Sequence, residues 1–157
     1  MQVIFRIEKL KSWGSVGASG AHNHRLRETQ NADPSKKNIE IIGPPPGMSV
    51  VEFAQLKLKD TKIRSNAVLG VEVLLTASPE YFRPENPKLH GSYDEKKLQA
   101  WRAVMEPWIK EKFPNAVSAV LHLDEATPHY HVIDLPLDAR GKLNCREKFG
   151  GKEKLAE

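Results

Sequence analysis

The chain has 157 residues, a formal net charge of +4 and a pI of about 9.2. This length supports one domain, residues 1–157, and argues against two. The basic balance favours a polyanionic partner, the single cysteine excludes an intramolecular disulfide, and no apolar run is long enough for a signal core or a membrane span. We therefore expect a cytoplasmic protein, in which Cys145 is a surface thiol without a role because it lies in a charged stretch.

The first third of the chain predicts two strands separated by a loop. Residues 2–10 alternate between apolar and polar side chains, as a half-buried strand does. Residues 13–20 are rich in glycine but lack the lysine and the Ser/Thr ending of a phosphate-binding P-loop, so we predict a flexible loop. A polar segment, helical or irregular, leads to a short strand over residues 38–42, which three prolines end.

The middle of the chain predicts a helix, a buried strand and a second helix. Ser49 and Glu52 form a capping-box signature at the start of a helix over residues 50–62. Residues 67–77 are almost continuously apolar, which is typical of a central strand covered on both faces. Apolar residues at helical spacing predict a helix over residues 94–113, with its tryptophans in the core and a kink or restart at Pro107.

The last third predicts an antiparallel hairpin formed by residues 116–125 and 129–138. A further helix begins near Arg146 and has no room to finish. We therefore expect the domain to be truncated at its C-terminal end.

Three of the six histidines are expected on one face of this hairpin. His129 and His131 are two residues apart on one strand, and if Asp124 pairs with His129, then His122 lies opposite His131 on the same face. Three imidazoles on one side of a divalent ion leave other coordination positions open for water or substrate. Asp124 shares that face and is expected to orient a ligand through the second nitrogen of its imidazole.

The histidine pattern by itself leaves the type of site open. Histidines in hairpins are often simply exposed, and the same three ligands would suit a nuclease, a structural zinc site or a small metal-binding barrel. Imidazole binds zinc, iron, copper, nickel and manganese, so the ligand type does not identify the ion.

Two motifs resemble those of the Pre/Mob family of plasmid mobilisation relaxases, the MobV type. The first lies in the polar segment and comprises His22, Asn23, Arg25, Asn31, Asp33 and Asn38. The second is similar to the family's H-x-D-E-x-T-P-H-x-H pattern and comprises His122, Asp124, Glu125, Thr127, Pro128, His129 and His131. Between them, the segment around Arg64 resembles the residues before the family's central strand, so the resemblance spans nearly the whole chain.

The resemblance implies an α+β fold of the HUH type, a mainly antiparallel sheet flanked by helices with the metal-binding histidines on a central hairpin. It implies that His122, His129 and His131 bind a divalent ion, with manganese favoured and magnesium or another divalent ion as alternatives. His22 would be the nucleophile that attacks phosphorus and forms a covalent phosphoramidate with DNA. Glu125 is the candidate for the carboxylate that accepts its proton.

The implied partner is DNA at a plasmid origin of transfer, with a single-stranded nick region and a hairpin. Asn23, Arg25 and Arg64 match the family pattern and are the expected DNA contacts. Contacts with a relaxosome or a coupling protein would use a C-terminal region expected beyond residue 157.

Three alternatives stay open at this point. The family pattern has no histidine at the position of His24, and if this segment is helical, only one of His22 and His24 faces the metal. A rolling-circle replication initiator of the HUH class would attack with a tyrosine, and Tyr81, Tyr93 and Tyr130 are present. A non-catalytic DNA-binding remnant of a relaxase is the third, because the family's domain normally continues further.

Overall fold

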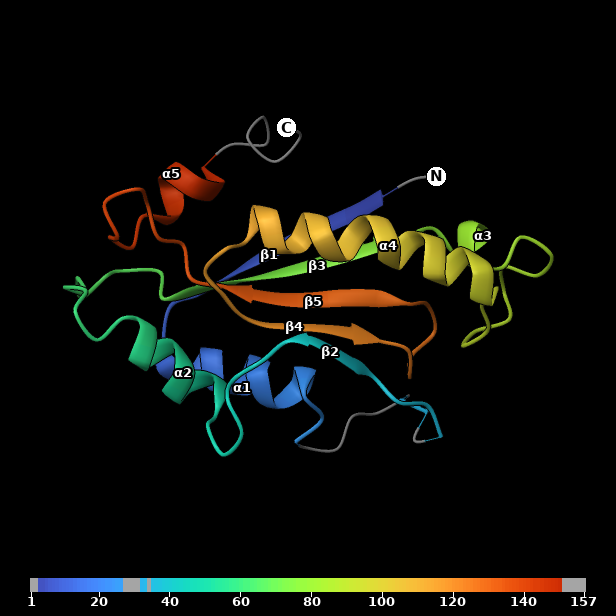
Figure 1. Ribbon diagram of the computed structural model, residues 1–157, viewed down its shortest axis with the longest axis horizontal. Coiled ribbons are helices and arrows are strands. Elements are labelled where there is room, and N and C mark those ends of the chain that lie inside the picture. Colours follow the sequence, from blue (N-terminus) through green and yellow to red (C-terminus); the bar gives the residue numbers. More distant parts are fainter. Residues whose placement is uncertain (1–2, 27–31, 34, 151–157) are drawn as a thin grey trace.

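The computed structural model describes residues 3–26, 32–33 and 35–150. Within these residues, five antiparallel strands form one sheet in the order β1-β3-β5-β4-β2 (Figure 1). The strands are β1 Val3–Leu10, β2 Ile39–Ile42, β3 Gly70–Ala77, β4 Ala116–His122 and β5 His129–Asp134. The β4–β5 hairpin therefore lies inside the sheet, and the predicted α+β class with a central hairpin is confirmed.

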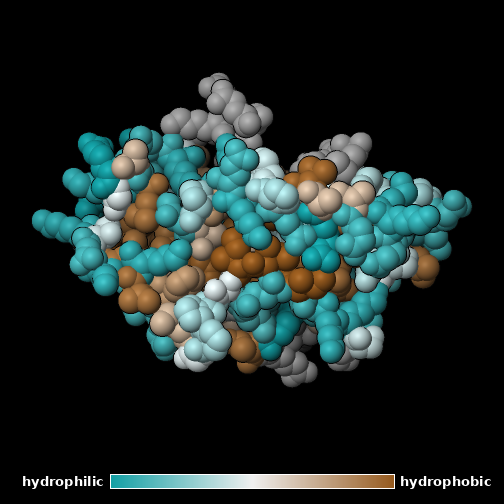
Figure 2. All heavy atoms as spheres, in the orientation of Figure 1, coloured by the Kyte–Doolittle hydropathy of each residue, from teal (hydrophilic) through white to brown (hydrophobic). Residues whose placement is uncertain are grey.

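Helices cover both faces of the sheet. They are α1 Trp13–Asn23, α2 Val50–Lys57, α3 Pro79–Phe82, α4 Glu95–Lys112 and α5 Cys145–Phe149. In Figure 1, α4 lies over one face, and α1 and α2 lie over the other. Figure 2 shows apolar residues gathered along the middle of this view, at the level of the sheet, with hydrophilic residues above and below them.

Alternation along β5 divides its side chains between these two faces. Tyr130 and Val132 belong to the core cluster that includes α4, whereas Ile133 belongs to the cluster that includes α1 and α2. His129 and His131 share the face of Ile133, so the histidines lie on the same side of the sheet as α1.

Helix α4 follows its prediction closely. Leu98, Trp101, Met105 and Ile109 are buried at helical spacing, and the helix continues through Pro107 as one element. Trp101 is 2% exposed, with its ring centroid 5.0 Å from that of Phe82 and 4.9 Å from that of Tyr130. The predicted core role of Trp101 is thus confirmed, and Trp108 is half-buried at the edge of the same cluster.

The loop predicted over residues 13–20 is wrong, because this segment forms helix α1. Ser12 caps the helix by accepting the N–H of Ser15, and the Ser15 side chain bonds back to the Ser12 backbone. Gly20 serves helix packing: a Cβ there would lie 2.9 Å from the Cβ of Val50 in α2. Glycine therefore allows α1 to lie close against α2, which outweighs its low helix propensity.

The predicted hairpin register is also wrong, although the three histidines still share one face of the sheet as predicted. His122 pairs with His129, and Val120 pairs with His131, instead of Asp124 pairing with His129. A slip of two residues preserves the face to which each side chain points, so the histidines still share one face. β4 ends at His122, which places Asp124 in the connection between the strands.

The structure corrects the prediction for Cys145 and describes only part of the predicted terminal helix. Cys145 is 8% exposed and packs in the main core at the start of α5, so it is not a surface thiol. The predicted terminal helix is described only as α5, since residues 151–157 lie outside the described residues. Among the described helices, none has the length and apolar character that crossing a membrane requires.

Candidate metal centre and nucleic-acid site

His122, His129 and His131 form a compact cluster on the α1 side of the sheet. Their ring centroids are 4.5 to 5.1 Å apart, and one ligand nitrogen from each lies within 4.8 Å of the others. His122 is fully buried, and the side chains of His129 and His131 are 12% and 14% exposed. Three imidazole nitrogens at this spacing fit the ligand set of a divalent transition metal ion.

Each imidazole is oriented by an oxygen that accepts a hydrogen bond from one of its nitrogens. The pairs are His122 Nε2 with Asn23 O at 2.8 Å, His129 Nδ1 with Thr127 O at 2.7 Å, and His131 Nδ1 with Glu72 Oε1 at 2.7 Å. A carbonyl or carboxylate oxygen can only accept, so the bonded nitrogen carries the proton. The opposite nitrogen of each ring keeps its lone pair, which is the state that metal ligation requires.

Glu72 is a site residue that the sequence reasoning missed. It lies on β3, where its two carboxylate oxygens bond His131 and the hydroxyl of Ser19 in α1. Burial disfavours its charged form, yet the hydrogen bonds from His131 and Ser19 hold the pKa of Glu72 below its usual value. The available signal was a lone carboxylate within an almost continuously apolar strand, which needs a buried partner.

His22 and His24 point in different directions at the end of α1. The ring centroid of His22 lies 6.0 Å from that of His131 and 6.4 Å from that of His122. His24 instead has Nε2 at 2.8 Å from Ser118 Oγ and Nδ1 at 3.1 Å from Glu40 Oε1. The structure therefore places His22 beside the cluster. Burial, followed by the nearby Arg25 charge, lowers the pKa of His22 and favours its neutral form.

Arg25 directly follows the C-cap of α1, and its side chain points back into the site. Its φ of 54° is in the left-handed region, a conformation that costs about 1–3 kcal/mol for a residue with a side chain. Nε and Nη2 donate to the two oxygens of Asp124, both at 2.8 Å, and Nη2 lies 2.5 Å from Glu125 Oε1. Arg25 Nη1 also donates to the backbone oxygen of His22 at 2.9 Å.

The two carboxylates after β4 both pair with Arg25 and differ in their other contacts. Asp124 was predicted to orient an imidazole, but its carboxylate forms the two-point pair with Arg25. Glu125 Oε1 lies 3.6 Å from His122 Nδ1 and 3.9 Å from His129 Nε2. The nearby His122 imidazole and the Arg25 guanidinium lower the pKa of Glu125 to about 2, so Glu125 is ionised at neutral pH.

Three residues of the first motif form hydrogen bonds with the end of β4 and the connection that follows it. Asn38 Oδ1 accepts the backbone N–H of Leu123 at 2.9 Å, and the N–H of Asp33 donates to the backbone oxygen of Asp124 at 2.5 Å. Asn23 was predicted to contact DNA, but its side chain is 0% exposed and its carbonyl holds His122. This burial argues against a DNA contact by Asn23.

An open hollow lies over the histidines. Its lining consists of His22, Leu74, Thr76, Glu125, Ala126, Thr127, His129 and His131. None of the three tyrosines lines it. The hydroxyl of Tyr130 bonds Glu106 on the opposite face, and that of Tyr81 bonds the backbone of Lys97.

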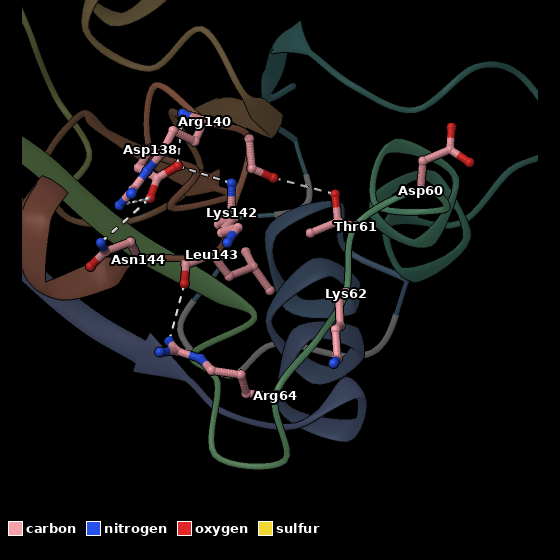
Figure 3. A pocket seen from close by; sticks show the side chains of 10 residues that line it. Asp60, Thr61, Lys62, Arg64, Asp138, Arg140, Lys142, Leu143 and Asn144 are labelled. Carbon is pink, nitrogen blue, oxygen red and sulfur yellow. Dashed lines mark hydrogen bonds and ion pairs between the residues drawn. The ribbon is translucent and has the colours of Figure 1, made fainter.

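Arg64 lines a second hollow that shares no residue with the first. Lys62, Arg64, Arg140 and Lys142 bring four cations to it, against the carboxylates of Asp60 and Asp138. Figure 3 shows these residues on two loops beside the hollow, with Arg64 directed at the backbone oxygen of Leu143, 3.1 Å away.

The fold and the site together define a class: an antiparallel sheet with three histidines on its central hairpin and a fourth histidine presented to them by a helix. The chain belongs to the Mob_Pre family, described as plasmid recombination enzyme, whose family model matches residues 1–157. The predicted family resemblance is thereby confirmed.

Similar proteins support the assignment to this family. A 65 kDa protein of Zymomonas mobilis is 34% identical over 98% of this chain and 26% of its own length. Plasmid recombination enzyme type 1 of Staphylococcus aureus is 26% identical over 98% of this chain and 39% of its own length. The MobM relaxase domain, solved with bound manganese and origin-of-transfer DNA of plasmid pMV158, superposes with a TM-score of 0.79 at 25% identity, covering 99% of this chain and 80% of that one. This chain thus spans about a quarter to two fifths of these two curated relatives.

Proposed function

We propose that this chain is a relaxase domain that nicks one strand of DNA at a plasmid origin of transfer and joins its own His22 to the cut end. The observation that carries the proposal is the approach of His22 to within 6.0 and 6.4 Å, between ring centroids, of two histidines of the cluster. The nucleophile comes from α1 and the ligands come from β4 and β5, so this meeting depends on the fold. The complex of the MobM domain with origin-of-transfer DNA supports the choice of substrate.

The proposed metal centre uses His122, His129 and His131, with manganese as the favoured ion because the similar MobM domain was solved with manganese. A bound divalent ion would neutralise a non-bridging phosphate oxygen and the charge that develops on phosphorus. The protein's contribution is the orientation of each ring by Asn23, Thr127 and Glu72.

In the proposed reaction, neutral His22 attacks phosphorus. An N–P bond forms, the P–O3′ bond breaks, and the 3′ oxygen leaves as a hydroxyl after taking up a proton. Glu125 is ionised and near the histidines, so it is our candidate for the group that accepts the imidazole proton. The reverse attack by the 3′ hydroxyl would rejoin the strand.

Arg25 and Arg64 have distinct proposed roles on DNA. Arg25 is paired with Asp124 and Glu125 and bonded to the His22 backbone, so it lies where the scissile phosphate would enter. Arg64 lies with three other cations in the second hollow, where we propose contacts with the phosphate backbone of the flanking hairpin.

The alternatives have less support. A tyrosine-dependent initiator needs a hydroxyl in the hollow over the histidines, and no tyrosine lines it. A binding remnant would not need an oriented histidine cluster with a neutral His22 beside it. Cytoplasmic location and contacts with relaxosome or coupling proteins stay predictions.

The test is a nicking assay on supercoiled plasmid that carries the cognate origin, with manganese or magnesium, read as relaxed circles and an SDS-stable protein–DNA adduct. His22→Ala should abolish the adduct while Mn²⁺ binding persists, and His24→Ala is the matched control that should still form it. An adduct that survives His22→Ala would refute the assignment of the nucleophile. Absence of cleavage with any divalent ion would refute the enzymatic proposal.

A further inference from the structure

The loop between α3 and α4, residues 83–93, lies against the connection between the two metal-ligand strands. Two backbone hydrogen bonds close this loop and attach it: Asp94 N to Phe82 O at 2.7 Å, and Gly91 N to Ala126 O at 2.8 Å. Gly91 has a φ of 83°, which favours glycine at this turn. The loop therefore has a fixed contact with residues that line the hollow over the histidines.

Arg83 is the side chain at the centre of this contact. It is 6% exposed and donates to four oxygens: Pro87 O at 2.7 Å, Ser92 O at 3.2 Å, Ala126 O at 2.7 Å and Thr127 Oγ1 at 3.0 Å. All four acceptors are neutral, and within the described part of the chain no carboxylate forms an ion pair with Arg83. Burial accordingly lowers its pKa from the usual value.

A buried cation without an ionic partner is costly, and an apolar side chain could fill the same space without that cost. What the planar guanidinium adds is four donors in fixed directions, two toward its own loop and two toward residues 126–127. Arg83 thus holds the peptide between Ala126 and Thr127 in one place.

That peptide leads directly to a metal ligand. The backbone oxygen of Thr127 accepts the Nδ1–H of His129 at 2.7 Å, which keeps Nε2 of His129 unprotonated for the ion. We infer that Arg83 is a positioning residue for His129, acting through Thr127. The inference rests on the proposed role of His129 as a metal ligand. Arg83 belongs to neither sequence motif, so only the packing of the loop points to it.

The test is the affinity for Mn²⁺ of the metal-free chain in the absence of DNA, measured by isothermal titration calorimetry at constant pH. Arg83→Gln should weaken binding about tenfold, at the lower end of the 10- to 100-fold effects of losing partners of metal-bound imidazoles. Arg83→Lys retains the charge but not the fork of donors and should also weaken binding. Arg146→Gln, an exposed cation on α5, is the matched control and should bind Mn²⁺ as the parent does.

A second pair of variants covers the case in which Arg83→Gln fails to fold. Thr127→Val keeps the shape and the backbone carbonyl but removes the hydroxyl that Arg83 contacts, and should weaken Mn²⁺ binding. Thr127→Ser restores the hydroxyl and should restore the affinity. The Nδ1–H signal of His129 in NMR spectra should exchange with solvent faster in Thr127→Val than in Thr127→Ser.

The outcomes separate this inference from the proposed metal site. If His129→Ala binds Mn²⁺ as tightly as the parent, the site itself is refuted. If His129→Ala loses binding but folded Arg83→Gln or Thr127→Val retains it in full, only the positioning role is overturned. Parent-like affinity in Arg83→Lys, with loss in Arg83→Gln, would likewise overturn it, because charge alone would then suffice.

Discussion

Removing the carboxylate of Glu72 should weaken metal binding without changing any of the three proposed metal ligands. Glu72 Oε1 accepts the Nδ1–H of His131 at 2.7 Å, and the two side chains are 16% and 14% exposed, so water replaces this bond poorly. In Glu72→Ala, His131 loses the acceptor that fixes the orientation of its ring and keeps the proton on Nδ1. The hydroxyl of Ser19 in α1 loses its partner as well.

The expected size of the effect follows from two independent ranges. A hydrogen bond to a charged group contributes about 1.5–3 kcal/mol. Loss of a partner of a metal-bound imidazole lowers metal affinity about 10- to 100-fold, which is about 1.4–2.7 kcal/mol. We expect Glu72→Ala near the upper end and Glu72→Gln near tenfold, because an amide oxygen can still accept the bond.

The assay is calorimetric titration of the metal-free variants with Mn²⁺, with Glu8→Gln as the matched control. Glu8 lies directly opposite Glu72 in the β1–β3 register and is exposed, so its neutralisation removes a nearby negative charge without touching an imidazole. Equal loss of affinity in Glu8→Gln would mean that charge and not contact controls binding. Parent-like affinity in Glu72→Ala would refute the reasoning outright.

Three further predictions concern stability. Trp101→Ala should lower the free energy of unfolding in urea by about 3–5 kcal/mol, the usual effect of emptying a buried aromatic site, and a change below 1 kcal/mol would contradict the packing of α4 on the sheet. Burial raises the pKa of Asp134 to about 6, although Lys148 Nζ lies 2.6 Å from its carboxylate. The folded chain therefore binds more protons at this group than the unfolded chain does between about pH 4 and 6. In denaturant titrations, the stability of the parent relative to Asp134→Asn should fall as the pH rises through that window. Mn²⁺ at 100 times its Kd should stabilise the folded chain by about 2.7 kcal/mol, seen as a higher midpoint of thermal unfolding, and His131→Ala should remove that increase.

Local sequence patterns determined which face of a strand each side chain occupies. The spacing of His129 and His131 placed them together, and the slip of two residues in the predicted pairing with His122 did not matter, because strand faces repeat every two residues. The apolar spacing of α4 likewise predicted its buried side. These features depend only on the periodicity of the strand or helix, which the spacing of neighbouring residues shows directly.

The sequence alone thus determined the family motifs, the three-histidine cluster and the class of fold. Tertiary structure decided which of His22 and His24 faces that cluster, that Gly20 of α1 allows close packing on α2, and that Glu72 contacts His131 and Arg83 contacts Thr127. The physical reason is that these roles arise from contacts between elements far apart in the chain, such as β3 with β5 and the α3–α4 loop with the connection after β4. Residue type and local spacing do not specify such partners; the packing of the folded chain does.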